Sequence, residues 1–445
     1  MTERKAASRA NVLAAFSLSL TVAVMLSKVN DSLWIDEATT LYTVHGTLSE
    51  VFSRTYQYQS QTPLYYIFVW LSTRLLGLDE IGLRLPSVIF VFAAASFLYL
   101  AGRRCFTSTP QSARFLPAIF LCIAEVNDAG VNARTYSLAL LCGIAAFYGA
   151  VALSEQYSGR NRSIFIASSL LCVYAHYLFA PFIAVLLVYL FVAQPTERRR
   201  LVADVLILGV GVLPLATAIL HIVSRRQSIN WMGPATWSQV FSLIVPAAEL
   251  LIAIGAVTVV SMLGRRVPRP GEFDLKAGYF RLTLGWCIAP VVALAFVSYV
   301  GGASVLAARY CILRVAGFAL LFLSGIRMFS FSEKIASYAI TLFVVMNLAA
   351  QQMFPRVENW REAARVLQSH TGDGSKPLLL WDGLIESDSV SWLEDPEKQE
   401  YLRGPLLLYP VAAKVTLLPW SLNSAENRDH VIHLLDDVTA KSEVL

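Results

Sequence analysis

The stretch NVLAAFSLSLTVAVMLSKVNDSLWIDEATTLY (residues 11–42) joins one long apolar run to an acidic pair. The apolar run near residues 10–27 is long enough to form a membrane helix. Asp36 and Glu37 follow just outside this run. Charged groups at the border of a membrane are costly unless they have a task. The pair therefore predicts a functional site beside the first membrane span.

Basic residues precede the first apolar run and set its orientation. Arg4, Lys5 and Arg9 resemble the start of a signal peptide, but the sequence SKVND that follows has no small-x-small cleavage site. We therefore expect a retained first helix with its amino end in the cytoplasm.

The composition predicts a polytopic membrane protein. The 445 residues are 56% hydrophobic and only 15% charged, which is too apolar for a soluble chain of this size. The net charge of +5 is small, and the Lys and Arg residues lie in short clusters between apolar runs. Such clusters fit the positive-inside rule better than a nucleic-acid surface, so no nucleic-acid partner is expected. The six cysteines show no CxxC spacing, which argues against a zinc site or a disulfide framework.

Eleven apolar runs are expected to cross the membrane. They lie near residues 10–27, 84–102, 113–125, 135–153, 163–177, 178–194, 201–222, 238–263, 281–300, 305–328 and 335–354. Residues 62–77 form a further apolar stretch. If it crossed, three arginine clusters, at 103–104, 160–162 and 198–200, would lie outside, so the charge bias favours a helix along the outer interface.

This topology gives three outer loops, at residues 28–83, near 126–134 and at 223–237. Arg225 and Arg226 in the third loop oppose the charge rule, and they are either tolerated there or serve to bind an anion.

The composition changes after Met353. Asn359 and Glu362 form a capping-box pattern at the start of a helix. KPLLLWD (376–382) and AKVTLLPW (413–420) are typical of strands, and AENRDHVIHLLDDV (425–438) is typical of a helix. The predicted fold is an all-α membrane domain at 1–354, with interfacial helices in 28–83, and a small extracytoplasmic α/β domain at 355–445.

The acidic pair has two interpretations. Asp36 is a good residue to cap a helix that begins with EATTLY, and Glu37 is then well placed on the helix dipole. Capping does not exclude catalysis, because the same turn holds a carboxylate in the fixed position that a general base needs.

Three further polar clusters are expected near the outer face. The first, EVNDAGVNARTY (125–136), contains Glu125, Asp128, Asn132, Arg134 and Tyr136; here Arg134 is either functional or a snorkelling interfacial residue. The second, YAHYLFAP (174–181), contains His176 and Tyr177, and its His is either a packing residue or part of a site. The third, LAARYCILR (306–314), contains Arg309 and Tyr310. An arginine there either binds a phosphate by paired hydrogen bonds or anchors the helix at the interface.

Taken together, these segments resemble a known family. They follow one collinear order: WIDEATTLY, TPLYYIFVWLSTRLLGLDEIGLRLPSVIF, ARTYSLALL, YAHYLFAPFIAVLL, ARYCILRVAG and ENWREAARVL. This order resembles the bacterial membrane glycosyltransferases of the GT-C fold, namely the protein mannosyltransferases and the aminoarabinose transferases of lipid A. The resemblance implies that Asp36 is the base and that the stretch beginning at Pro63 lies along the membrane surface.

The resemblance implies transfer of a sugar from a polyprenyl-phosphate donor to a lipid, glycan or protein acceptor, with inversion, at the outer face of the bacterial inner membrane. The absence of a P-loop and of GxGxxG agrees with a donor that has no nucleotide. The candidate residues are, for catalysis, Asp36, Glu37 and Asp128; for the donor phosphate, Arg309, Arg134 and Tyr310; and for substrate, Tyr65, Tyr136, His176 and Tyr177.

The chain departs from the family pattern at two positions. Thr62 stands before Pro63 where many relatives have a second proline, and Asn132 stands where many relatives have Glu. If an acid is needed there, Asp128 or Glu125 must supply it. No metal ligands are assigned, and a requirement for a divalent metal stays open.

Two other functions fit a polytopic chain. A flippase or other transporter of lipid-linked glycans predicts charged residues deep within several spans, and few are present. A polymerase or ligase of surface polysaccharide predicts one large outer loop late in the chain rather than an acidic pair after the first span.

Overall fold

The computed structural model describes residues 2–59, 61–106, 110–224, 233–263, 274–301, 304–328, 331–353, 358–371, 377–381 and 383–441. The chain forms two compact units. The larger takes its described residues from Met1–Val29, Arg84–Ser224 and Met232–Pro355, and the smaller takes its described residues from Asn30–Leu83 and Arg356–Leu445. Arg225 and Arg226 lie outside the described residues.

The larger unit consists mainly of helices in its described part. Its α-helices are α1 (Thr2–Ser27), α5 (Glu80–Cys105, whose first turn belongs to the smaller unit), α6 (Leu116–Cys122), α7 (Ala124–Gly130), α8 (Tyr136–Glu155), α9 (Gly159–Ala175), α10 (Ala180–Ala193), α11 (Arg198–Val212), α12 (Leu215–Ser224), α13 (Trp237–Ile244), α14 (Ala247–Leu263), α15 (Ala277–Gly301), α16 (Arg314–Met328) and α17 (Glu333–Gln352). Short helical turns join them: η2 (Pro110–Phe115), η3 (Tyr177–Phe179), η4 (Pro195–Glu197) and η6 (Ala308–Cys311).

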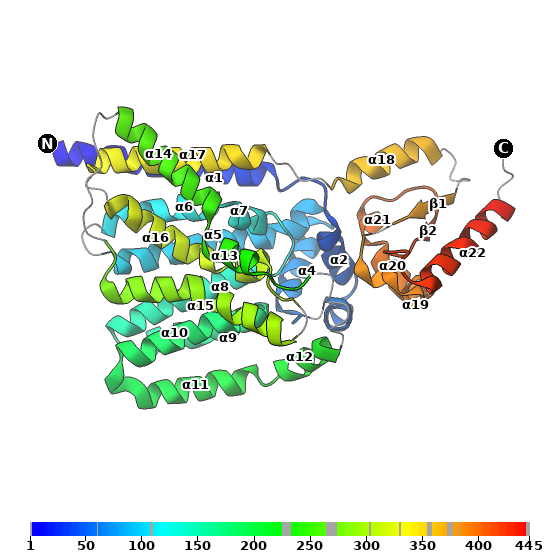
Figure 1. Ribbon diagram of the computed structural model, residues 1–445, viewed down its shortest axis with the longest axis horizontal. Helices are drawn as coiled ribbons and strands as arrows, with labels where there is room; N and C mark the ends of the chain where they lie inside the picture. Colours follow the sequence, from blue (N-terminus) through cyan, green and yellow to red (C-terminus); the bar gives the residue numbers. More distant parts are fainter. Residues whose placement is uncertain are drawn as a thin grey trace. The chain divides into compact units, whose positions relative to one another are not determined.

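Helices that are distant in the sequence lie side by side in this unit. α1 runs along α17, and α10 packs against α15 (Figure 1). Between α8, α10 and α15, the fully buried ring of Trp286 meets Phe147 and Phe182 at centroid distances of 5.3 and 5.0 Å. The Trp286 indole N–H also donates to the Leu313 carbonyl at 2.7 Å, so this large side chain is buried without an unsatisfied donor.

The described residues include six helices that are long and apolar enough to cross a membrane, or seven if a bent pair counts as one span. The six are Ser8–Ser27, Glu80–Cys105, Tyr136–Glu155, Trp237–Leu263, Ala277–Gly301 and Glu333–Gln352, and the pair is Tyr177–Ala193 with Pro195–Val212, bent by 104°. The predicted multi-pass membrane class is therefore confirmed. The count of eleven spans stays a prediction, because α9 and α16 have only 17 and 15 residues.

The helix expected along the interface is short. α4 (Leu64–Leu76) has 13 residues. At about 1.5 Å per residue it is about 20 Å long, against the roughly 30 Å of a bilayer core. Its length therefore falls short of a membrane span.

The smaller unit joins the first loop to the carboxyl-terminal region, a grouping that the sequence analysis did not anticipate. Its elements are α2 (Ile35–Val44), α3 (Leu48–Arg54), the π-helical turn η1 (Thr55–Gln59), α4, α18 (Trp360–Thr371), β1 (Pro377–Leu380), η7 (Ile385–Asp388), α19 (Val390–Glu394), α20 (Pro396–Leu402), α21 (Gly404–Leu408), β2 (Lys414–Leu417) and α22 (Ala425–Lys441). A shared core of apolar side chains from both segments, including Tyr42, Tyr58, Tyr401 and Leu402, explains why they form one unit.

The elements predicted in the carboxyl-terminal region are present. β1 and β2 pair in parallel, with Leu380 opposite Leu417. The Asn359 side chain accepts the Glu362 N–H at 3.1 Å, which is the predicted cap of α18.

Close helix contact makes Gly149 sensitive to substitution. A methyl group on Gly149 of α8 would lie 2.9 Å from the Cα of Phe165 and 3.0 Å from its backbone nitrogen on α9, so the helices would have to separate. We expect Gly149→Ala to lower the free energy of unfolding by about 1–3 kcal/mol. Chemical denaturation of the purified protein in detergent measures this change.

Gly209 in α11 is the matched control. A methyl group there meets nothing within 4 Å. Gly209→Ala should therefore be neutral or stabilising by up to about 1 kcal/mol, because alanine favours a helix. Equal stability of the two variants would contradict close packing at Gly149.

Candidate functional site

The acidic pair lies in the first turn of α2. The helix begins at Ile35, so Asp36 and Glu37 are its second and third residues. Glu37 is fully buried, and its Oε2 accepts the Trp34 N–H at 3.3 Å. The Ile35 N–H donates to Oε2 of Glu358 at 2.8 Å. Two glutamates therefore cap this end of α2, whereas Asp36 lies inside the helix and is only partly buried.

Gln59 ties η1 and α4 to α2. Its side-chain amide donates to the Thr39 carbonyl at 3.0 Å and to the Thr43 hydroxyl at 3.1 Å, while its oxygen accepts from the Tyr66 hydroxyl at 3.1 Å. Tyr65 and Tyr66 are both fully buried, with ring centroids 5.6 Å apart. Tyr65 is therefore a packing residue of α4 in this structure, and its role toward substrate stays a prediction.

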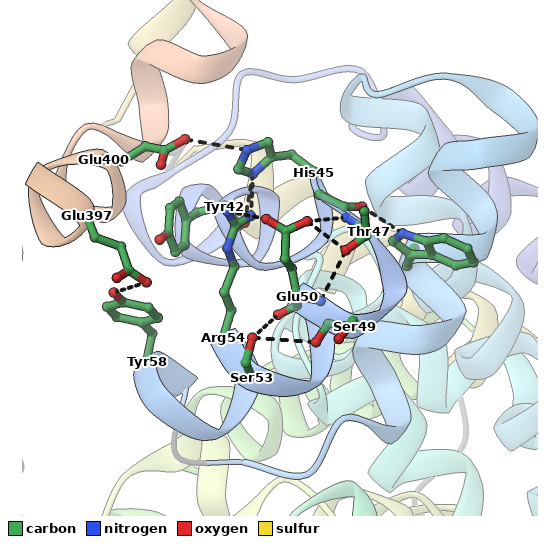
Figure 2. Close-up of polar contacts among 12 residues, drawn as sticks. Tyr42, His45, Thr47, Ser49, Glu50, Ser53, Arg54, Tyr58, Glu397 and Glu400 are labelled. Atoms are coloured by element: carbon green, nitrogen blue, oxygen red, sulfur yellow. Dashed lines mark hydrogen bonds and ion pairs between the residues drawn. The ribbon is translucent and has the colours of Figure 1, made fainter.

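Figure 2 shows a second polar group at the other end of α2. The Arg54 guanidinium donates to the Tyr42 carbonyl at 3.0 Å and pairs with Glu50 at 3.1 Å. His45 Nε2 lies 3.5 Å from Oε1 of Glu400 on α20. None of these residues was among the site residues predicted from the sequence, although Thr47 with Glu50 is a capping box that predicts the start of α3.

The same end of α2 carries an aromatic cluster. Tyr58 stacks on Tyr401 at 4.8 Å, and Tyr42 meets both rings edge-on. The Tyr58 hydroxyl donates to Glu397 at 3.3 Å. Burial raises the pKa of Tyr42 and of Tyr58 above the usual value of 10, so both hydroxyls stay protonated at neutral pH.

In the larger unit, three segments that were predicted separately come together around His176. Its ring is 2% exposed, and its centroid lies 5.9 Å from Tyr136, 5.1 Å from Tyr177 and 5.3 Å from Tyr310. Its Nδ1 accepts the Leu178 N–H at 3.3 Å. The structure thus gives His176 a packing and capping role, and a role in substrate binding stays a prediction.

Two predicted arginines lie close to this aromatic group. The positive charges of Arg134 and Arg309 both act on His176, and the Arg309 guanidinium lies 5.4 Å from the Tyr310 ring. Residues from three separate parts of the chain therefore place two cations and four rings near one another. Such a group is suited to an anionic ligand with apolar or sugar faces.

Glu125 has a structural partner in Arg314. The two side chains form an ion pair at 2.5 Å. Arg314 is only 4% exposed, and it also donates to the carbonyls of Leu243 at 2.8 Å and Ala308 at 3.2 Å. The ion pair gives Glu125 a structural role. Asp128 is therefore the better candidate for the second acid of the loop.

Asn132 interacts directly with Asp128. Its amide nitrogen donates to Oδ2 of Asp128 at 2.6 Å, and Asp128 is exposed. A glutamate at position 132 would instead set a second carboxylate against Asp128. The departure from the family pattern therefore orients one carboxylate rather than adding another. Within the described ranges, no group of three or more His, Cys, Asp or Glu is arranged to hold a metal ion.

An apolar cavity of about 830 Å³ lies between α6, α14, α16 and α17. Its walls are mainly aliphatic and aromatic, with Glu125, Arg314 and Glu249 as charged residues. Because Arg314 is already paired with Glu125, the cavity has apolar walls suited to a hydrocarbon group and no unpaired positive charge of Arg314 to bind an anion.

Comparison with known families finds a match for part of the chain. Residues 60–223, which are 164 of the 445 residues, match the family model described as dolichyl-phosphate-mannose-protein mannosyltransferase. This is a GT-C family that uses polyprenyl-phosphate sugars, so the resemblance is confirmed and the chain is a membrane glycosyltransferase. No curated protein matches the chain. The matched segment contains Asp128, Arg134 and His176 but neither Asp36 nor Arg309, and the match tests the role of none of these five residues.

The ion pair at the cavity generates a prediction. Arg314→Met should leave Glu125 without its counter-ion, and we expect the free energy of unfolding to fall by about 3–5 kcal/mol. Adding Glu125→Gln should recover part of this loss, because the uncompensated charge is removed. Denaturation of the purified variants in detergent measures both effects. A double variant no more stable than Arg314→Met alone would contradict the pairing.

Proposed function

We propose that this membrane glycosyltransferase moves a sugar from a polyprenyl-phosphate carrier to a lipid, glycan or protein acceptor at the outer face of the membrane. In this proposal Asp36 removes a proton from the acceptor hydroxyl or amine. The acceptor atom bonds to the anomeric carbon of the sugar. The bond from that carbon to the phosphate oxygen breaks, and its electron pair leaves with the polyprenyl phosphate. One direct displacement inverts the configuration at the anomeric carbon.

The fixed position of the first turn of α2 carries this proposal. Glu37 and Glu358 accept the backbone N–H groups of Trp34 and Ile35, so the cap of this turn is supplied by residues other than Asp36. Asp36 is a partly buried carboxylate in this helical turn, and a general base needs such a fixed placement.

The leaving phosphate monoester needs positive charge. Arg134 and Arg309 are the proposed donors, because guanidinium groups bind phosphate by paired hydrogen bonds. Arg314 is less suited, since its three nitrogen atoms are engaged by Glu125 and two carbonyls. Tyr310, Tyr136 and Tyr177 are proposed to contact the substrates, and Asp128, oriented by Asn132, is proposed as the second acid.

Mass spectrometry of membrane lipids and surface glycans tests the proposal. Cells without the gene should accumulate a polyprenyl-phospho-sugar and lose one modification, which identifies the donor and the acceptor. No difference between cells with and without the gene would reject a transferase of this class.

Asp36→Asn tests the base. The amide keeps the size of the side chain but cannot accept the proton, so we expect normal abundance and a transfer rate lower by a factor on the order of a hundred or more. The rate is measured with purified protein added to membranes of cells that lack the gene, which supply donor and acceptor. Glu37→Gln is the comparison. A wild-type rate for Asp36→Asn would move the base to Glu37 or Asp128.

The proposed topology has eleven spans, a cytoplasmic amino end and the carboxyl-terminal region outside, in the bacterial inner membrane. In a variant without the six native cysteines, Ser158→Cys should react with an impermeant thiol reagent only from the cytoplasm, and Ser49→Cys only from outside. The reason is that a crossing at residues 62–77 would place three arginine clusters outside. Labelling of Ser158→Cys from outside would contradict this topology.

A further inference from the structure

The residues just before Asp36 are held by side chains from the far end of the chain. The Ile35 N–H donates to Glu358 at 2.8 Å, and the Leu33 N–H donates to the Tyr409 hydroxyl at 2.9 Å. The Arg361 backbone N–H donates to the Ser32 hydroxyl at 3.1 Å. The stretch from residue 31 to residue 34 has no regular secondary structure of its own. These bonds therefore fix a segment that its own sequence does not fix.

Arg361 and Tyr409 also converge on Glu80. The Tyr409 hydroxyl donates to Glu80 Oε1 at 2.6 Å, and Arg361 forms an ion pair with the same oxygen. The Arg361 guanidinium reaches the Asn30 carbonyl at 2.9 Å. One buried hydroxyl thus accepts from the chain before α2 and donates to the start of α5.

A backbone contact restrains the other side of the turn. Gly404, the first residue of α21, lies so close to α2 that a methyl group there would stand 2.9 Å from the Ala38 carbonyl oxygen. Ala38 is two residues after Asp36. The carboxyl-terminal region therefore restrains the acidic turn both before and after the carboxylate.

We propose that Glu358, Arg361 and Tyr409 are positioning residues that hold the first turn of α2 so that Asp36 stays aligned with the acceptor. This inference rests on the proposed role of Asp36 as base. The physical reason is that a displacement of about 1 Å in a reacting group can cost about a hundredfold in rate. The carboxyl-terminal region thereby contributes to catalysis by positioning the turn that carries Asp36.

Tyr409→Phe and Glu358→Ala test the proposal in the full-length protein. We expect both to increase hydrogen exchange in peptides covering residues 30–38 and to leave exchange in α8 unchanged. The maximal transfer rate into membranes of cells that lack the gene should fall by about ten- to a hundredfold, with the donor concentration for half-maximal rate unchanged. The thermal midpoint should fall by only a few degrees.

Two further variants separate positioning from stability. Glu358→Gln keeps an oxygen that accepts the Ile35 N–H, so it should recover most of the rate lost in Glu358→Ala. Glu426→Ala, which removes an exposed carboxylate in the first turn of α22, is the control and should have the wild-type rate.

The outcomes distinguish this inference from the proposed function. If Asp36→Asn is inactive but Tyr409→Phe and Glu358→Ala keep the wild-type maximal rate, the positioning role is wrong and the base assignment stands. A Glu358→Gln variant as slow as Glu358→Ala would also overturn it. If Asp36→Asn transfers sugar at the wild-type rate, the base assignment fails, and the positioning role fails with it.

Discussion

A charged side chain buried among apolar helices needs hydrogen-bond or ion-pair partners close to it, and this constraint determines how helices pack in the larger unit. The Arg84 guanidinium is fully buried and donates to the Val29 carbonyl at 3.0 Å, just beyond the end of α1. Asp204 is fully buried on α11 and is held by Tyr157 and Arg162. Since an unpaired charge in such surroundings costs several kcal/mol, each of these contacts fixes the relative position of two helices. The polar groups near His176 therefore lie on helices whose relative positions these contacts fix.

Hydrogen bonds serve a different purpose in the smaller unit. Its polar groups satisfy the backbone of an irregular segment instead of neutralising charges in an apolar interior. The carboxylates of Glu37 and Glu358 take the backbone donors at the amino end of α2, where the helix dipole favours negative charge. The cap of α2 is therefore supplied by these two glutamates and not by Asp36.

The sequence predicted elements well and long-range partners poorly. The apolar runs, the cap at Asn359 and the strands near residues 377 and 414 follow from local pattern, and local pattern is visible in a single chain. Tyr136, His176 and Tyr310 were predicted on the same side of the membrane, whereas their contact with one another was not predicted. The pairing of Arg314 with Glu125, and of Tyr409 with Leu33 and Glu80, had no sequence signal, because one guanidinium or hydroxyl can bond any nearby oxygen. The interpretation of Asp36 as a cap is wrong, because the helix begins at Ile35, two residues earlier than expected.

The smaller unit also has a consequence for the order of synthesis. Asp36 is made early, yet Glu358 and Tyr409 follow it by more than three hundred residues. At roughly 5–20 residues per second, a ribosome needs on the order of twenty seconds to a minute to make that interval. During this time the helices of the larger unit can enter the bilayer while the acidic segment still lacks its partners. A nascent chain can therefore insert first and acquire its ordered acidic turn last, and a product terminated before residue 358 would lack the side chains that hold this turn.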